Sequence, residues 1–160
     1  MMTRFLSFMK SAPVALLLFL MPFVQGHAAE SFNQEQLTVT SQEGVVHKFT
    51  VELALTDGQR QQGLMFRRHM TDNAGMLFDF DESRRVTMWM KNTFIPLDML
   101  FISEDGTVTS VQHNAVPQSE AVIDSGGLVR FVLELNAGIA KKLMLKPGSR
   151  VESEHIKRLN

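Results

Sequence analysis

The sequence predicts a mainly β protein, either a jelly-roll-like β-sandwich or a partly closed barrel, with two short helices. Apolar and polar residues alternate over about seven or eight short segments, which is the pattern of half-buried strands. Turn residues separate these segments, and only two stretches carry helix signals. We expect residues 37–155 to form a single domain. Such a domain is long enough to bury a core without disulfides, and the chain contains no cysteine.

A polar segment leads into the first strand pair. Residues 29–36 are expected to form a flexible arm. Leu37–Thr40 and Phe49–Leu55 then flank a turn at residues 42–44, and apolar residues alternate cleanly along the second of these segments. This pattern predicts an antiparallel hairpin at the start of the domain.

Two short helices are expected, one near each end of the domain. Thr56 is followed three residues later by Gln59, which is a capping box, so the first helix should begin there and end near Gly63. Asn136 is a suitable cap for the second helix, Ala137–Leu145, whose lysines lie near its C-terminus, where cations are favoured.

The remaining strands follow the same alternation. We expect a turn at Asp81–Arg85, a hairpin turn at residues 104–106, and a long loop at Asn114–Gly127. Leu97–Ile102 is apolar on both faces apart from Asp98, so this strand should be central in the sheet. The expected strands are Met76–Phe80, Val86–Met90, Leu97–Ile102, Thr107–Val111, Val129–Leu135 and a last one through Val151.

Residues 1–28 have the three-part layout of a secretory signal peptide. Arg4 and Lys10 give a basic start, an apolar run follows, and Gly26 and Ala28 stand at the −3 and −1 positions of a cleavage point. The apolar run is shorter than the ~20 residues that a membrane-spanning helix needs. We therefore expect cleavage, no stable membrane span and a periplasmic or secreted protein. The alternative is an uncleaved leader that holds the protein at the inner membrane.

The charge of the chain excludes a general affinity for nucleic acid. The net charge is −1, and removal of the leader with its two basic residues leaves 14 basic against 17 acidic residues. The basic doublets Arg67-Arg68 and Arg84-Arg85 do not extend into a patch. The sequence predicts no oligomeric state.

Five motifs match one known family in order and spacing. The motifs are GLMFRRHM (63–70), GMLFDF (75–80), WMKNTFIPLDMLFI (89–102), FVLELNAG (131–138) and KPGSRV (146–151). On these motifs the chain resembles the family called domain of unknown function 192 over roughly Val51–Val151. The resemblance implies a small, often exported, mainly β single domain with a jelly-roll-like sandwich, and it implies no reaction.

The segment from Trp89 to Thr93 combines side chains that suit ligand recognition. In strand geometry Trp89 and Lys91 share one face, while the apolar neighbours share the other. The indole and the ammonium group can form a cation–π pair worth ~0.5–2 kcal/mol, or the indole can serve as a stacking platform for a sugar. Asn92 and Thr93 add hydrogen-bonding groups at a turn.

Two acidic residues stand in otherwise apolar strands. A lone buried carboxylate costs several kcal/mol, so Asp98 should meet a cation or several N–H donors. Lys91 and Arg67 are the expected partners of Asp98. Glu134 also needs a partner if it is buried, and Arg130 lies on the same face of its strand.

Three functions are compatible with these residues. The first is a pocket for a small polar or anionic envelope ligand, such as a carbohydrate. The second is an envelope hydrolase that uses Asp98 and Glu134 as general acid and base. The third is a structural or interaction module in which the same groups only hold the fold together. The predicted binding residues are Arg67, Trp89, Lys91, Asn92, Thr93, Asp98 and Glu134.

No cofactor or metal is expected. The histidines lack the spacing of a zinc site. The methionines lie mainly at core-facing positions rather than in the clusters that bind copper. The chain also lacks a phosphate-binding glycine loop and a dinucleotide fingerprint.

Overall fold

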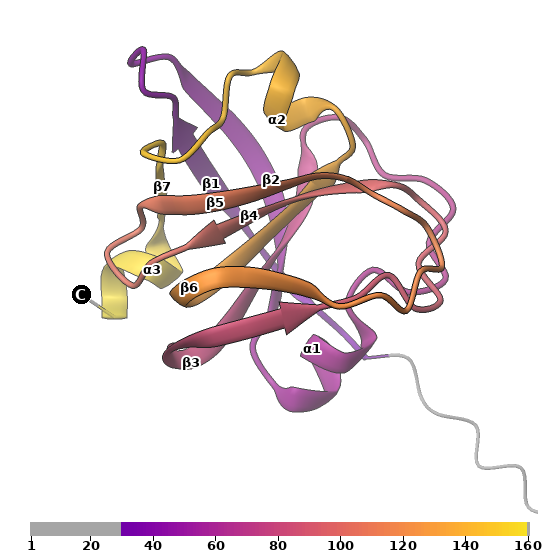
Figure 1. The fold of residues 1–160 in the computed structure, drawn as a ribbon. Helices are drawn as coiled ribbons and strands as arrows, with labels where there is room; N and C mark the ends of the chain where they lie inside the picture. Colours follow the sequence, from indigo (N-terminus) through magenta and orange to yellow (C-terminus); the bar gives the residue numbers. More distant parts are fainter. Residues whose placement is uncertain (1–29, 160) are drawn as a thin grey trace, which may run out of the picture.

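The computed structural model describes residues 30–159, which form one curled, seven-stranded sheet with three short helices (Figure 1). The strand order is β5-β4-β6-β3-β2-β1-β7, and every neighbouring pair is antiparallel except the parallel pair β2–β3. The elements are β1 Asn33–Thr40, β2 Val46–Ala54, α1 Asp57–Gln62, β3 Ala74–Met88, β4 Leu97–Ile102, β5 Val108–Ala115, β6 Ile123–Asn136, α2 Ile139–Lys142, β7 Arg150–Ser153 and α3 Glu154–Leu159.

The two edge strands of the sheet meet at one end. Thr107, just before β5, forms an antiparallel bridge with Arg150 of β7. The amide of Val108 donates to the carbonyl of Ser149 at 2.9 Å, and the amide of Gly148 donates to the carbonyl of Val108 at 2.8 Å. The sheet is therefore a partly closed barrel, which confirms the mainly β fold that the alternation predicts.

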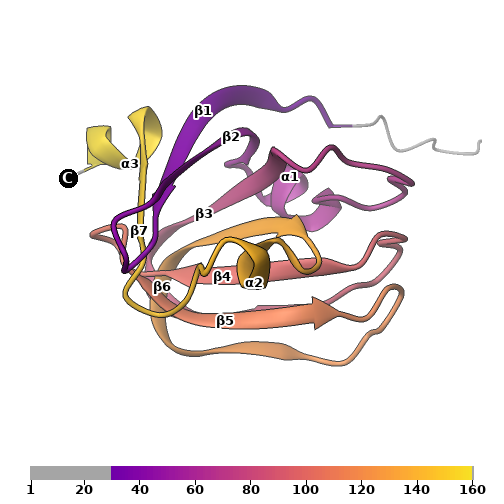
Figure 2. The same cartoon turned by 90° about the horizontal axis from the view of Figure 1, so that it is seen from above.

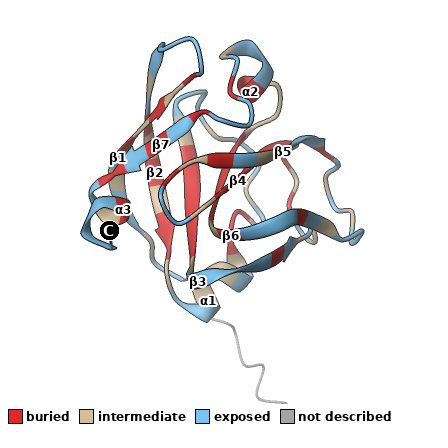
Figure 3. Cartoon of the chain, turned by 60° about the vertical axis from the view of Figure 1, so that its left-hand side comes forward, coloured by how far each residue is buried: buried red, intermediate tan, exposed pale blue. Residues whose placement is uncertain are grey.

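The sheet buries apolar side chains on both faces. The barrel core gathers residues from all seven strands, including Leu133 and Leu135 of β6, and α2 lies over it (Figure 2). The outer cluster lies on the opposite face of β3, β4 and β6 and includes Val132, together with Leu64 and Met90 from the loops. β4 is buried along its whole length (Figure 3), as expected for a central strand.

The strand β3 is longer than the sequence predicts. The expected turn at Asp81–Arg85 is wrong, because β3 runs without a break from Ala74 to Met88. The register with β6 shifts between Asp79 and Arg84, and Asp81 has a φ of 69°. The charged segment Asp81–Arg85 is thus a solvent-exposed β-bulge within the long strand pair β3–β6.

Two segments that look irregular in sequence also pair as strands. The expected loop at Asn114–Gly127 is wrong at both ends, because β5 reaches Ala115 and β6 begins at Ile123. The first half of β1, Asn33–Gln36, was expected in the flexible arm but pairs with β2. Asn33, Gln34 and Gln36 are polar and exposed, so their pairing depends on backbone hydrogen bonds that apolar alternation does not reveal.

The helices agree with the sequence in part. Thr56 and Gln59 form the predicted capping box of α1. The second helix is shorter than expected, and α3, which buries Ile156 against the barrel core, was not predicted. None of the helices in residues 30–159 has the length and apolar character needed to cross a membrane. The predicted leader, 1–28, lies outside the described residues.

Candidate functional site

A cavity of about 100 Å³ lies beside the outer cluster and opens toward a wider groove of about 460 Å³. The two hollows share Gln61, Gln62, Met65, Trp89 and Lys91, so they adjoin. We call the smaller hollow the inner cavity; its lining includes Gly63, Leu64, Phe78, Trp89, Lys91, Thr93 and Glu134. We call the larger one the outer groove; its lining includes Glu30, Gln61, Gln62, Phe66, Trp89, Lys91 and Asn92.

The loop that carries Trp89 and Lys91 is held between two other loops by backbone hydrogen bonds. The amide of Phe66 donates to the carbonyl of Asn92 at 2.8 Å, and the amide of Gln118 donates to the carbonyl of Thr93 at 3.0 Å. Phe66, Asn92 and Gln118 all have positive φ, at 65°, 55° and 60°. A backbone in this region is strained for side chains other than glycine, and such strain concentrates at functional sites.

α1 and the turn after it form one wall of the site. Gly63 ends the helix with a φ of 46°, and a Cβ added there would stand 3.1 Å from the ring of Phe78. A glycine is therefore required for the chain to turn this close to β3. The turn brings Leu64 and Met65 to the cavity.

Glu134 lies in the wall of the inner cavity without a partner. It stands on β6 between Met76 of β3 and Met99 of β4, and it is 4% exposed. Among the described residues, no side chain or backbone group forms a hydrogen bond or ion pair with its carboxyl group. Burial raises the pKa of Glu134 to about 8, because the apolar surroundings disfavour the charged form. The carboxyl group is therefore protonated at neutral pH and faces the cavity as a hydrogen-bond donor and acceptor.

Trp89 and Lys91 form the boundary between the two hollows. The Nζ atom of Lys91 lies 5.3 Å from the centroid of the Trp89 ring, which is the cation–π geometry expected from the sequence. Trp89 is 46% exposed, so it is not a core residue. The Nζ atom of Lys91 also lies 4.0 Å from Glu120, a long contact between exposed groups. The ammonium group thus remains accessible to a ligand.

Asp98 meets backbone N–H donors, which confirms one of the two kinds of partner that its burial predicts, but it does not meet the two cations expected for it. Its Oδ1 accepts from the amide of Asn114 and its Oδ2 from the amide of Ala140, both at 2.9 Å. The second contact caps α2, whose own cap residue, Gly138, contributes no side-chain bond. Asp98 therefore fixes the β4–β5 bulge and α2 in place, and the expected ion pair with Lys91 or Arg67 is wrong.

Arg67 also lies outside the site. Its Nη1 donates to Oε1 of Glu52 at 2.7 Å, and its Nη2 pairs with Oε2 of the same carboxylate. This bidentate pair links the loop after α1 to β2. Arg130, which shares a strand face with Glu134 in the sequence pattern, instead bonds Asp79 and Glu104.

The two acidic residues proposed for a hydrolase point to opposite sides of the sheet. Paired residues on neighbouring strands lie on the same face. Glu134 pairs with Met99, whereas Asp98 pairs with Leu135. Asp98 and Glu134 consequently cannot flank one scissile bond, and the two-carboxyl arrangement is wrong.

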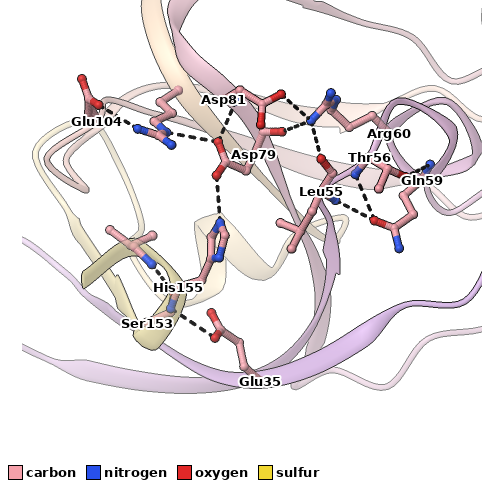
Figure 4. Close-up of polar contacts among 12 residues, drawn as sticks. Glu35, Leu55, Thr56, Gln59, Arg60, Asp79, Asp81, Glu104, Ser153 and His155 are labelled. Carbon is pink, nitrogen blue, oxygen red and sulfur yellow. Dashed lines mark hydrogen bonds and ion pairs between the residues drawn. The ribbon is translucent and has the colours of Figure 1, made fainter. Parts of the chain in front are cut away.

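A polar cluster that the sequence did not reveal surrounds Asp79, between Phe78 and Phe80 in β3 (Figure 4). Asp79 accepts from His155 at 2.8 Å and from Arg130 at 3.1 Å, and Arg130 also bonds Glu104. Burial opposes ionisation of Asp79, but the hydrogen bonds from His155 and Arg130 outweigh it and hold its pKa below the usual value. The cluster ties α3 to the barrel. The only sequence signal for this cluster was Asp79, an acidic residue within the otherwise apolar strand segment GMLFDF.

Of the seven residues predicted to bind a ligand, the structure brings five together. Thr93 and Glu134 line the inner cavity, Asn92 lines the outer groove, and Trp89 and Lys91 line both. The sequence missed the wall residues from α1 and β3. Their signals were the capping box before Gly63 and the alternation that places Phe78 and Phe80 on one face.

Two solved structures share the fold and much of the sequence. A protein from Sinorhizobium meliloti 1021, proposed as a transcription regulator, is 54% identical, with a TM-score of 0.76 over 78% of this chain and 97% of its own. A protein of unknown function from Novosphingobium aromaticivorans DSM 12444 is 39% identical, with a TM-score of 0.75 over 79% of this chain and 90% of its own.

No curated protein matches the chain. The model of the family DUF192, described as "Uncharacterized ACR", matches residues 38–153. This match covers most of the sequence and agrees with the motifs, and the chain therefore belongs to the DUF192 family.

Proposed function

We propose that the protein binds a small polar ligand in the inner cavity and the outer groove. The observation that carries this proposal is the unpaired carboxyl group of Glu134, buried in the wall of a cavity. Burying a polar group without a hydrogen-bond partner destabilises the fold, and buried polar groups are nearly always paired. A titratable group with a strongly shifted pKa in a cleft is a candidate for function. A ligand that bonds Glu134 would supply the missing partner.

The lining restricts the chemistry of the ligand. Protonated Glu134 offers one donor and one acceptor, and Lys91 offers a positive charge at the boundary of the hollows. The exposed indole of Trp89 offers a flat apolar face. These groups favour a ligand with a polar or anionic part and a flat or ring-shaped body, such as a carbohydrate. Trp89, Lys91, Asn92, Thr93 and Glu134 are the binding residues that we propose.

The place of action that we propose is the bacterial envelope, following cleavage of the leader. The regulator description of the Sinorhizobium protein is a property of that protein. A net charge of −3 after removal of the leader does not favour nucleic acid as the ligand here.

Hydrolysis is the second candidate. A carboxyl group that keeps its proton near neutral pH suits a general acid. However, Glu134 is the only carboxyl group among the described residues that line the inner cavity. A glycosidase of the usual kind needs two carboxyl groups across the bond. Binding is therefore the function that the lining supports best.

The single tryptophan provides a direct test. Trp89 is the only tryptophan and the chain has no tyrosine, so its emission reports the site alone. The full chain is titrated with neutral sugars, sugar acids, amino acids, nucleotides and dicarboxylates, and emission and melting temperature are recorded. We expect at least one class to give a saturable emission change and a higher melting temperature. Lys91→Met should weaken the effect at least tenfold.

The matched control is Lys157→Met, which removes an exposed lysine from α3. This variant should bind like the wild type. Binding is contradicted if every compound leaves the emission and melting temperature unchanged, or if the two lysine variants behave alike.

A further inference from the structure

We propose that the ligand is an N-acetylated amino sugar, with its acetamido group in the inner cavity beside Glu134 and its ring against Trp89 in the outer groove. This inference rests on the proposed binding function and specifies its ligand class. Three features carry it: the size of the inner cavity, the composition of its walls, and the side-chain amides of the outer groove.

The inner cavity admits a substituent rather than a sugar ring. Its volume is about 100 Å³, and one water molecule takes about 30 Å³ in the liquid. A group of a few heavy atoms fits this space, and an acetamido group has four. The sugar ring would then lie in the outer groove, which is more than four times larger, at about 460 Å³.

The walls of the inner cavity match both ends of an acetamido group. Leu64, Phe78 and Phe80 supply apolar surface that suits the methyl group. The carbonyl oxygen and the N–H of a trans amide point in opposite directions, so one carboxyl group reaches only one of them. Protonated Glu134 donates to the amide carbonyl. Thr87 and Thr93 also line the cavity; the hydroxyl of Thr93 donates to the carbonyl of Lys91 at 3.3 Å, so its oxygen remains available as an acceptor for the amide N–H.

Other common sugar substituents fit the inner cavity less well. A carboxylate would meet the cations Arg60 and Lys91 in the lining, but Arg60 already bonds two carboxylates and two backbone carbonyls, and a carboxylate would leave the apolar walls without contacts. A hydroxymethyl group would leave the apolar walls without contacts. An amine would require Glu134 to ionise, although its surroundings favour the protonated form. Of the substituents compared, the acetamido group uses both the donor of Glu134 and the apolar walls.

The outer groove offers the groups that hydroxyl-rich rings need. Gln61, Gln62 and Asn92 line it, and each side-chain amide presents a donor and an acceptor. Trp89 is 46% exposed and Phe66 is 62% exposed, and both line the groove. Such exposed aromatic faces pack against the C–H face of a pyranose ring. The groove therefore suits a neutral sugar ring.

Three β-1,4-linked trisaccharides test the inference, because they differ only in the substituent at C2 of each ring, which is acetamido, amino or hydroxyl. N-acetylglucosamine trimer, glucosamine trimer and glucose trimer are each titrated into the full chain at pH 7, with Trp89 emission as the readout. We expect the acetylated trimer to bind at least tenfold more tightly than the other two. Glu134→Leu should remove this preference, whereas Glu134→Gln, which keeps a donor and an acceptor, should retain it.

The outcomes separate this inference from the function on which it rests. Equal binding of the acetylated and glucose trimers, tighter binding of the glucosamine trimer, or a preference that survives Glu134→Leu would overturn the acetamido assignment. If another class of compound binds with dependence on Lys91 and Glu134, the assignment fails but the binding function stands. If none of the compounds binds, both fail.

Discussion

Glu134 and Asp79 are two acids on neighbouring strands, each 4% exposed, with pKa values shifted in opposite directions. Burial disfavours the charge on both. Asp79 receives hydrogen bonds from His155, Arg130 and the amide of Asp81, and these lower its pKa despite burial. Glu134 has no such donors among the described residues, and its pKa rises. The two side chains have the same small exposure, but Glu134 is surrounded more deeply by protein, so both its deeper burial and its lack of donors separate its charge state from that of Asp79.

The comparison separates a structural acid from a candidate functional one. Asp79 stabilises the fold through its partners, whereas Glu134 has no such partners among the described residues and lies in a cavity wall. Arg60 lies between the two regions, since its guanidinium donates to the backbone carbonyl of Asp79 at 2.6 Å and the same side chain lines the inner cavity. The two regions therefore share one rigid frame.

The largest loss of stability is expected from Asp79→Asn. The substitution removes the negative charge from a buried ion pair with Arg130, which is 11% exposed, and should cost about 3–5 kcal/mol. Because the pKa of Asp79 is lowered, its contribution is present above the pKa of the unfolded chain and is lost as pH falls through the folded pKa. The free energy of unfolding of the Asp79→Asn variant should therefore fall less than that of the wild type as the pH is lowered. Urea denaturation from pH 2 to pH 7 measures both effects.

The control for this substitution is Glu82→Gln, which changes an exposed acid on the same strand. It should alter stability by less than about 0.5 kcal/mol. The structural role of Asp79 is refuted if the two variants lose equal stability.

A smaller loss is expected from Asp98→Asn. The amide keeps one acceptor, so one of the two backbone N–H groups from Asn114 and Ala140 loses its partner, at a cost of about 1–3 kcal/mol. Amide hydrogen exchange should accelerate at these two residues more than elsewhere in the barrel. Unchanged exchange at both positions would show that Asp98 is not the cap that the geometry indicates.

The fold was largely predictable from sequence because its signals are local. Alternation from Phe49 to Leu55 directly marks a strand with one buried face, and Thr56 with Gln59 marks the helix that follows. The bulge at Asp81–Arg85 was mistaken for a turn because charged residues on an exposed strand carry no burial pattern. The start of β6 was missed for another reason, because its Asp-Ser-Gly-Gly stretch, residues 124–127, is typical of a loop.

The candidate site was predictable only where its members are neighbours in sequence. Trp89, Lys91 and Thr93 lie within five residues, and their proximity follows from the chain itself. The partners of Asp98 are backbone N–H groups, which no side-chain pattern identifies. The isolation of Glu134 depends on which residues of β3, β4 and the loops surround it, and that is a property of the whole fold.

The most direct test of the central claim is the pH dependence of unfolding for the wild type and Glu134→Gln. Glu134 has a folded pKa of about 8 against a usual value of 4.5. The folded state therefore binds more protons than the unfolded state between these values, and stability should fall as pH rises through this window. At about 1.4 kcal/mol for each pH unit, the loss relative to the glutamine variant reaches at most about 5 kcal/mol.

We therefore predict that the two proteins have similar free energies of unfolding at pH 4.5 and that the wild type becomes the less stable one by pH 9. The added instability of the wild type should follow a single titration, and the emission of Trp89 should change over the upper part of the same pH range. Parallel stability curves for the wild type and the glutamine variant from pH 4.5 to pH 9 would contradict the claim that Glu134 is an unpaired, neutral acid in the cavity wall.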